Sequence, residues 1–230
     1  MIIYGWQKLT LQDFPGKVST ILFTKGCNFN CGYCHNKELI PSNGADAIPQ
    51  KEVFRYLDER EGKVDGVVIT GGEPTMQKDL LEFASELKRR GLAVKLDTNG
   101  SRPDIIRDGI ARGLFDYVAM DYKFPAAHYT SIVNIAIDQE VIRQSRELLK
   151  ESSIPHEFRV TLVENLFTDE VLRMMADELA GDSPVVLQSF SNENVNDPSF
   201  EAYPSTTYRF MEHAASILRE SCASVNIRDA

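Results

Sequence analysis

The chain has 230 residues, with 25 Lys and Arg against 34 Asp and Glu, so its formal net charge is -9. Hydrophobic residues at 43% and charged residues at 26% exclude a wholly disordered, collagen-like or coiled-coil chain. The acidic balance argues against a nucleic-acid partner. No apolar run approaches the roughly 20 residues that span a bilayer, and the opening residues do not predict a secretory signal. We therefore expect one cytoplasmic domain over residues 1–230: an N-terminal extension (1–17), a βα core (18–220) and a tail (221–230).

Short β-rich runs alternate with amphipathic helices along the chain. The periodicity predicts strands at 18–24, 66–70, 92–97, 117–120, 157–163 and 185–188. It predicts helices at 51–60, 77–90, 104–111, 139–150 and 206–219, and another that Thr168 caps. Six successive β-α units require parallel strands with right-handed crossovers and helices outside. The fold class is therefore α/β, either a doubly wound sheet or a partial barrel, with the active site at the C-terminal ends of the strands in both cases.

Three of the four cysteines directly follow the first of these strands. Cys27, Cys31 and Cys34 have the spacing C-x3-C-x2-C, and thiolates suit iron–sulfur clusters and zinc. Three close thiolates can hold three irons of a 4Fe–4S cluster and leave the fourth iron open to another ligand. A Cys3His zinc site that uses His35 and a structural disulfide are alternatives. Cys222 is distant in sequence, and we expect it to be an inert free thiol.

Polar residues follow or interrupt the later strands. Gly71-Gly72-Glu73-Pro74 ends the second strand, Asp97-Thr98-Asn99-Gly100 the third, and Asp121-Tyr122-Lys123 the fourth. Arg159 lies within the fifth strand, where a charge is unexpected unless it is paired or faces a polar interior. A ligand site is one interpretation. A strand-to-helix turn, ordinary solvent exposure of strand ends and an ion pair at Arg159 are the others.

The cysteine spacing, with an aromatic residue at Tyr33, resembles the signature of radical S-adenosylmethionine (SAM) enzymes. The run from Asp13-Phe-Pro-Gly-Lys17 to Cys34-His-Asn36 resembles the glycyl-radical-enzyme activating proteins, most of all those of anaerobic ribonucleoside-triphosphate reductase. The resemblance covers nearly the whole chain and is more specific for the superfamily than for the target. It implies a partial (βα)6 barrel of the radical SAM type, with parallel strands and outer helices.

The resemblance also implies roles for individual residues. Cys27, Cys31 and Cys34 would hold one 4Fe–4S cluster, and Glu73 would accept a hydrogen bond from the methionyl amino group of SAM. Asp97 and Asp121 would bind a monovalent cation near the SAM carboxylate; the relatives' methionine two places before the second aspartate is Ala119 here. The residues implied to contact SAM are Tyr33, His35, Gly71, Gly72, Glu73, Asn99, Asp121, Lys123 and Arg159, and Lys123 joins the three cysteines as a catalytic residue.

The implied reaction is reductive cleavage of SAM at the cluster, after which a 5′-deoxyadenosyl radical abstracts a Cα hydrogen from a glycine of a partner protein. Anaerobic ribonucleotide reductase is the expected partner. Pyruvate formate-lyase and other glycyl radical enzymes are alternatives, but activators of the lyase carry a histidine near the end of the sixth strand, where this chain has Gln188-Ser189-Phe190. A radical SAM enzyme of small molecules would need a larger pocket and lid. A zinc-binding interaction module is the non-enzymatic alternative.

The charge distribution indicates where an electron donor would dock. Residues 1–40 hold four lysines (Lys8, Lys17, Lys25 and Lys37) against two acidic residues, a net charge of +2 in an otherwise acidic chain. A positive face near the cluster loop would attract an acidic flavodoxin or ferredoxin-like donor. Ordinary solvated lysines are the alternative.

Overall fold

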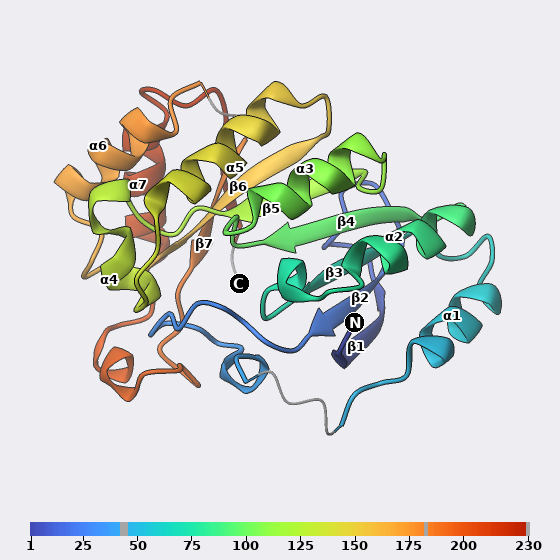
Figure 1. Ribbon diagram of the computed structural model, residues 1–230. Helices are drawn as coiled ribbons and strands as arrows, with labels where there is room; N and C mark the ends of the chain where they lie inside the picture. The colour runs from blue at the N-terminus through green and yellow to red at the C-terminus, as the bar shows by residue number, and fades with distance from the viewer. Residues whose placement is uncertain (42–45, 182–183, 229–230) are drawn as a thin grey trace.

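The computed structural model describes residues 1–41, 46–181 and 184–228. Their strands form one eight-stranded sheet in the order β1 to β8 (Figure 1). Strand β1 is antiparallel to β2, and each later strand pairs in parallel with the one before it. The strands are β1 (Ile3–Thr10), β2 (Ser19–Thr24), β3 (Gly66–Gly71), β4 (Ala93–Thr98), β5 (Tyr117–Asp121), β6 (His156–Leu162), β7 (Val185–Ser189) and β8 (Val225–Arg228).

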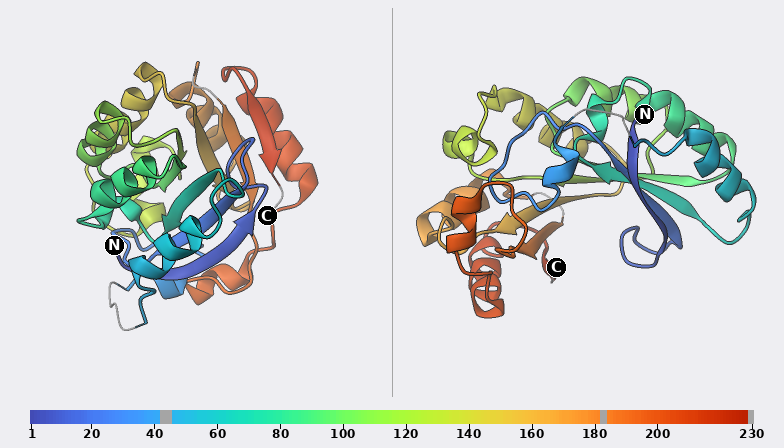
Figure 2. Two further views of the ribbon diagram at one scale, coloured as in Figure 1. Left: turned by 90° about the vertical axis from the view of Figure 1, so that its right-hand side faces the viewer. Right: turned by 90° about the horizontal axis from the view of Figure 1, so that it is seen from below.

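Helices cover the outer face of the curved sheet, which Figure 2 shows end on in its left view. They are α1 (Gln50–Asp58), α2 (Leu80–Arg89), α3 (Pro103–Ala111), α4 (Tyr129–Val133), α5 (Gln139–Glu151), α6 (Asp169–Glu178) and α7 (Tyr208–Leu218). The predicted cap of α6 is present, since Thr168 Oγ1 accepts a hydrogen bond from Val171 N at 3.3 Å. Within the described part of the chain, no helix is long and apolar enough to cross a membrane.

The predicted α/β fold, with parallel strands and outer helices in a partial barrel, is confirmed. The sheet has one more strand at each edge than the sequence predicted. The presumed N-terminal extension contains β1, and the presumed tail contains β8, which pairs with β7 from Val185↔Val225 to Gln188↔Arg228. A four-residue strand is too short to show a periodic pattern, and only pairing with a strand far away in sequence defines it. The five-residue helix α4 escaped the sequence prediction for the same reason.

The two faces of the sheet differ in character. Outward-facing residues such as Val67, Leu96 and Val118 are fully buried under the helices. On the inner face, Ile21 and Val68 pack with Phe14 in a small separate cluster, next to Tyr117. The apolar inner residues of β2 and β3 thus close the bottom of the barrel, the end at which these strands begin. Higher up, the inner face becomes polar.

The β1–β2 hairpin supplies the residue that closes this bottom. Its turn includes Gly16, whose φ of +70° favours glycine, and it directs Phe14 (2% exposed) against β2 and β3. Because β2 starts at Ser19, this turn lies at the opposite end of the strands from the cysteine loop, which follows Thr24. The segment 13–17, with which the run that resembles the activating proteins begins, thus packs at the bottom of the barrel and does not line the site.

Candidate functional site

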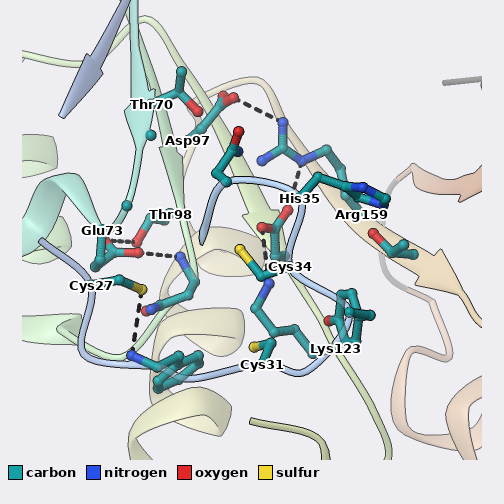
Figure 3. Close-up of a pocket in the computed structure, with 18 of the residues that line it drawn as sticks. Cys27, Cys31, Cys34, His35, Thr70, Glu73, Asp97, Thr98, Lys123 and Arg159 are labelled. Atoms are coloured by element: carbon teal, nitrogen blue, oxygen red, sulfur yellow. Dashed lines mark hydrogen bonds and ion pairs between the residues drawn. The ribbon is translucent and has the colours of Figure 1, made fainter. Parts of the chain in front are cut away.

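A cavity of about 310 Å³ lies at the C-terminal ends of the parallel strands (Figure 3). This is the location that the βα topology predicts for a ligand site. The cavity wall includes every residue for which the sequence predicts a site role: Cys27, Tyr33, Cys31, Cys34, His35, Gly71, Gly72, Glu73, Asp97, Asn99, Asp121, Lys123 and Arg159. The polar residues that follow or interrupt the strands therefore meet at one site, as the sequence predicts, and their roles depend on their contacts there.

The three cysteines lie on a loop that is held to the rest of the barrel through its backbone. Cys27 N donates a hydrogen bond to Ile40 O at 3.1 Å, and Asn30 N donates to Val133 O at 2.9 Å. Cys34 N closes a turn onto Cys31 O at 3.2 Å. The loop thus has a defined path even though it contains no helix or strand between the thiols.

All three thiols are free and line the same cavity. Cys31 is buried, whereas Cys27 and Cys34 are partly exposed. Burial raises the pKa of Cys27 to about 12 and that of Cys31 to about 11, and it also raises the pKa of Cys34. Metal ligation requires thiolates, so metal binding must displace a proton from each sulfur.

A second segment, which we call the strap (residues 190–203), lies against the cysteine loop. Asp197 N donates to Gly32 O at 2.9 Å, and Asn196 Nδ2 donates to Asn30 Oδ1 at 2.9 Å and to Cys31 O at 3.2 Å. Gly32 has no room for a side chain, because a Cβ there would lie 2.3 Å from Phe200 Cε2. The strap was not predicted from the sequence, since its partners lie more than 160 residues away.

The two residues beside the third cysteine also contact the strap. His35 Nδ1 lies 3.2 Å from Glu193 O, and its ring lies 5.8 Å from that of Phe190. Tyr33 is buried, with its ring 6.3 Å from that of Phe200. Their predicted contact with SAM remains a prediction, and a role in holding the strap is visible in the structure.

Gly71 and Gly72 allow the end of β3 to approach the cysteine loop. A Cβ on Gly71 would lie 2.4 Å from the backbone of Thr24, and one on Gly72 would lie 2.3 Å from Gly26 O. Gly71 also has a φ of +115°. We expected the glycines to let a ligand approach, and the structure shows first that they let two backbone segments meet.

Glu73 is fully buried and its carboxylate is fixed by four hydrogen bonds. Oε1 accepts from Thr75 N at 3.0 Å, from Thr75 Oγ1, and from Thr98 Oγ1 at 2.7 Å, while Oε2 accepts from Asn99 N at 2.7 Å. Burial outweighs these hydrogen bonds and raises the pKa of Glu73. Because Oε2 has only one of these partners, it keeps a lone pair with which to accept a hydrogen bond from a ligand ammonium group.

Asn99 connects the end of β4 to the cysteine loop. Its Nδ2 donates to Asn28 Oδ1 at 3.0 Å, and Asn28 Nδ2 in turn donates to Ser101 Oγ at 2.8 Å. The side chain that was predicted to contact SAM is thus already used to hold Asn28. Its backbone N–H holds Glu73, so Asn99 positions both parts of the site.

The opposite wall of the cavity is ionic. Arg159 Nη1 lies 2.9 Å from Asp97 Oδ2 and Arg159 Nε lies 2.8 Å from Asp121 Oδ1. Lys95 Nζ lies 2.8 Å from Asp97 Oδ1, and Lys123 Nζ lies 3.2 Å from Asp121 Oδ2. Burial alone would raise the pKa of each aspartate, but these cations outweigh it and lower both pKa values. Arg159 is therefore paired with two aspartates, as the ion-pair alternative predicted.

Lys123 lies between the ionic wall and the cysteine loop. Burial alone would lower its pKa, but Asp121 together with Tyr33, Cys31 and Tyr129 outweighs burial, and the pKa of Lys123 is raised well above its usual value. Its ammonium lies 5.9 Å from the centroid of the Tyr33 ring. The lysine is thus a fixed positive charge beside the three thiols.

Further cavity residues lie on the later strands: Thr161 of β6, which had not been identified from the sequence, and Gln188 and Ser189 of β7, which had been noted there but given no site role. Thr161 lies two residues after Arg159, so the alternation of a strand places both on the inner face. Gln188 pairs in register with Thr161. The alternation was the signal that could have identified Thr161.

The expected positive face near the cysteine loop is wrong for three of its four lysines. Lys8 and Lys17 lie on the β1–β2 hairpin at the far end of the strands. Lys25 is buried, with its ammonium 4.0 Å from the centroid of the Tyr4 ring. Lys37 is near the cysteine loop, but it donates to Val195 O of the strap at 3.2 Å.

The residues present fit a cluster with three protein ligands. Three free thiols line one cavity, and each binds a different iron of such a cluster, so they need not converge on one point. Among the described residues, no three His, Cys, Asp or Glu side chains converge as a single metal ion would require. The ring of His35 contacts the strap, which does not support the Cys3His zinc alternative. The fold and the cavity thus define a radical SAM type of site.

Comparison with known proteins agrees with this class. The model of the radical SAM superfamily matches residues 21–219. The "Putative glycyl-radical enzyme activating enzyme MJ1227" of Methanocaldococcus jannaschii is 31% identical over 232 residues, which cover 99% of this chain and 95% of that protein. A 7-carboxy-7-deazaguanine synthase of Clostridium acetobutylicum is 26% identical over 81% of this chain and 85% of its own.

The fold similarity extends to solved structures. Streptococcus suis SuiB bound to its precursor peptide SuiA superposes with a TM-score of 0.68 at 13% identity, over 90% of this chain. This chain spans about half (48%) of SuiB, so this likeness concerns the fold alone.

The chain belongs to the radical SAM superfamily and, within it, to the glycyl-radical-enzyme activating enzymes. It is therefore an enzyme that uses a 4Fe–4S cluster and SAM. Activating enzymes of this family act on glycyl radical enzymes, so a partner of that kind is supported.

Proposed function

We propose that this enzyme installs the glycyl radical on anaerobic ribonucleoside-triphosphate reductase, in the cytoplasm, where thiols are kept reduced. The observation that carries the proposal is the position of Gln188 and Ser189 in the cavity wall. Activators of pyruvate formate-lyase, which this chain resembles less, carry a histidine near this point. The segment 13–17 also resembles activators of the reductase, but it lies at the other end of the barrel and therefore supports the family more than the substrate.

The chain's own side chains would hold SAM between the two walls of the cavity. When bound, the cluster supplies the electron that cleaves the sulfonium S–C5′ bond. Glu73 Oε2 would accept a hydrogen bond from the SAM ammonium group, and Arg159 and Lys123 would attract its carboxylate. These contacts fix the C5′ carbon with respect to the glycine, whose Cα hydrogen ends on 5′-deoxyadenosine while methionine leaves.

The electron would come from a flavodoxin or ferredoxin-like protein. The lysines that we expected to form a positive face for this donor do not gather beside the cysteine loop, and Lys25 is buried. We therefore do not expect the rate of electron transfer from the donor to depend strongly on salt. The strap and the cysteine loop would form the docking area, because they are the segments that cover the thiols.

A small-molecule reaction is the second candidate. The similarity to 7-carboxy-7-deazaguanine synthase covers 85% of that enzyme, so a chain of this size does not by itself favour a protein substrate. The expectation that a small-molecule enzyme needs a larger pocket and lid therefore does not separate the two functions by chain length.

One assay separates the candidates. The enzyme with its cluster, SAM and a reductant is incubated with the reductase, with pyruvate formate-lyase, or alone, and electron paramagnetic resonance records the glycyl doublet. We expect the doublet on the reductase. A doublet on the lyase alone would overturn the target, and SAM cleavage stimulated by a precursor of 7-carboxy-7-deazaguanine without any doublet would favour the second candidate.

A further inference from the structure

The guanidinium of Arg159 lies between two carboxylates of neighbouring strands. Asp121 and Arg159 are opposite one another in the β5–β6 register, and Asp97 projects from β4 on the other side of β5. The side chains of Arg159 and Asp97 are only 13% and 10% exposed, and Figure 3 shows their ion pair at the edge of the cavity. The bridge is therefore part of the barrel interior and is not a surface pair.

The charges around the Asp97–Arg159–Asp121 bridge disfavour the binding of a further cation. The three cations Lys95, Lys123 and Arg159 surround the two carboxylates, so each aspartate has two basic partners within 3.2 Å. The group has a net charge of +1 before any ligand binds. A metal cation between the aspartates would have to displace one of these partners inside a poorly solvated site, where like charges repel strongly.

Arg159 also keeps hydrogen-bond donors for a ligand. A guanidinium has five N–H groups, and the two contacts to the aspartates use Nε and Nη1. No described residue accepts a hydrogen bond from Nη2. The donors of this nitrogen can therefore serve a carboxylate that enters the cavity, and the net charge of +1 favours that carboxylate.

We propose that Arg159 takes the place of the monovalent cation that the family resemblance implies, so that SAM binds here without sodium or potassium. The inference rests on SAM binding in this cavity. It changes the predicted role of Asp97 and Asp121, which become the carboxylates that position Arg159. Arg159 then contacts the SAM carboxylate directly, and the two aspartates are the positioning residues.

The first test compares salts on the wild-type enzyme with its cluster. The dissociation constant of SAM is measured by equilibrium dialysis at equal ionic strength in choline chloride, sodium chloride and potassium chloride. We expect values within twofold of one another. A gain of tenfold or more in sodium or potassium would overturn the inference and leave the proposed function intact, whereas failure to bind SAM in any salt would instead contradict the function.

The second test removes the bridge. Arg159→Ala should weaken SAM binding at least tenfold, and added guanidinium should restore it toward the wild-type value. Arg143→Ala, which removes an exposed arginine from α5, is the matched control and should change nothing. If the alanine variant fails to fold, Arg159→Lys takes its place in the test. This variant retains the positive charge but cannot bridge both aspartates, so it should bind SAM with an affinity between those of the wild type and a variant without the charge. SAM affinity unchanged in the lysine variant, or no response of a folded alanine variant to guanidinium, would contradict the role.

Discussion

The two walls of the cavity are built in different ways. The ionic wall lies on adjacent strands of one sheet, where Asp121 faces Arg159 in register and Asp97 lies two residues after Lys95 on the same face. The cysteine wall lies on a loop between β2 and the 3-10 turn at Lys37–Leu39. Its position depends on the strap, whose contacts with it cross more than 160 residues of sequence.

The two walls therefore differ in how far their side chains are held in position before a ligand binds. Sheet hydrogen bonds hold the charges in place whether or not a ligand is present. The thiols depend on a few loop contacts and on their metal, which binds only when it displaces their protons. Changes to the strap should therefore affect the cysteine wall, and changes to strand residues should affect SAM without removing the cluster.

The largest expected effect comes from the thiols themselves. Replacing Cys27, Cys31 or Cys34 with Ala should remove the cluster and abolish SAM cleavage, because each thiolate binds a different iron. Iron and sulfide analysis after anaerobic purification measures the first effect, and 5′-deoxyadenosine formation measures the second. Cys222→Ala, which changes a buried thiol outside the cavity, is the control. Loss of the cluster in that variant alone would show that the ligands are assigned wrongly.

Glu73→Gln should have the next largest effect, and only on SAM. Loss of the charge-assisted hydrogen bond to the ammonium group costs about 1.5–3 kcal/mol, which weakens binding roughly 10- to 100-fold. Equilibrium dialysis of SAM measures this, and iron content should stay at the wild-type level. Glu82→Gln on the exposed face of α2 is the matched control. Normal SAM affinity in Glu73→Gln would exclude Glu73 as the ammonium acceptor.

The strap can be tested with a pair of substitutions. Gly32→Ala places a Cβ against the ring of Phe200 and should lower the free energy of unfolding by about 1–3 kcal/mol. It should also reduce the iron retained per chain. Adding Phe200→Ala opens the required space, so the double variant should regain part of the loss. Urea unfolding of the apo forms and iron analysis provide the measurements, and additive losses would show that the two residues do not interact.

The smallest expected effect is a pH dependence of stability. The pKa of Glu73 is raised in the folded state, so the folded protein holds this proton more tightly than the unfolded chain, whose glutamate titrates near ~4.3. The stabilising contribution is therefore complete below that pH and is lost as the pH rises through the folded pKa. A tenfold difference in proton affinity corresponds to about 1.4 kcal/mol. Urea unfolding between pH 4 and 8 should show a flatter profile for Glu73→Gln than for the wild type, and parallel profiles would contradict this.

The sequence by itself determined the succession of parallel strands and the chemical identity of the site, while the choice of a partial barrel over a doubly wound sheet came only from the family resemblance. Alternating β and α periodicity predicted parallel strands, and the topology of such strands brings their C-terminal ends together, so Cys27, Glu73, Asp97 and Lys123 could be placed at one site without coordinates. The cysteine spacing identified the superfamily. These inferences rest on local patterns, which a single segment of sequence contains in full.

Only the tertiary structure decided how these residues are used. It assigned Arg159 to both aspartates, gave the close approach of Gly72 to the backbone at Gly26, and brought the strap onto Gly32. It also buried Lys25, which had been expected on a charged face. Each of these outcomes depends on contacts between segments far apart in the chain, and periodicity and spacing contain no information about which side chain will reach which distant partner.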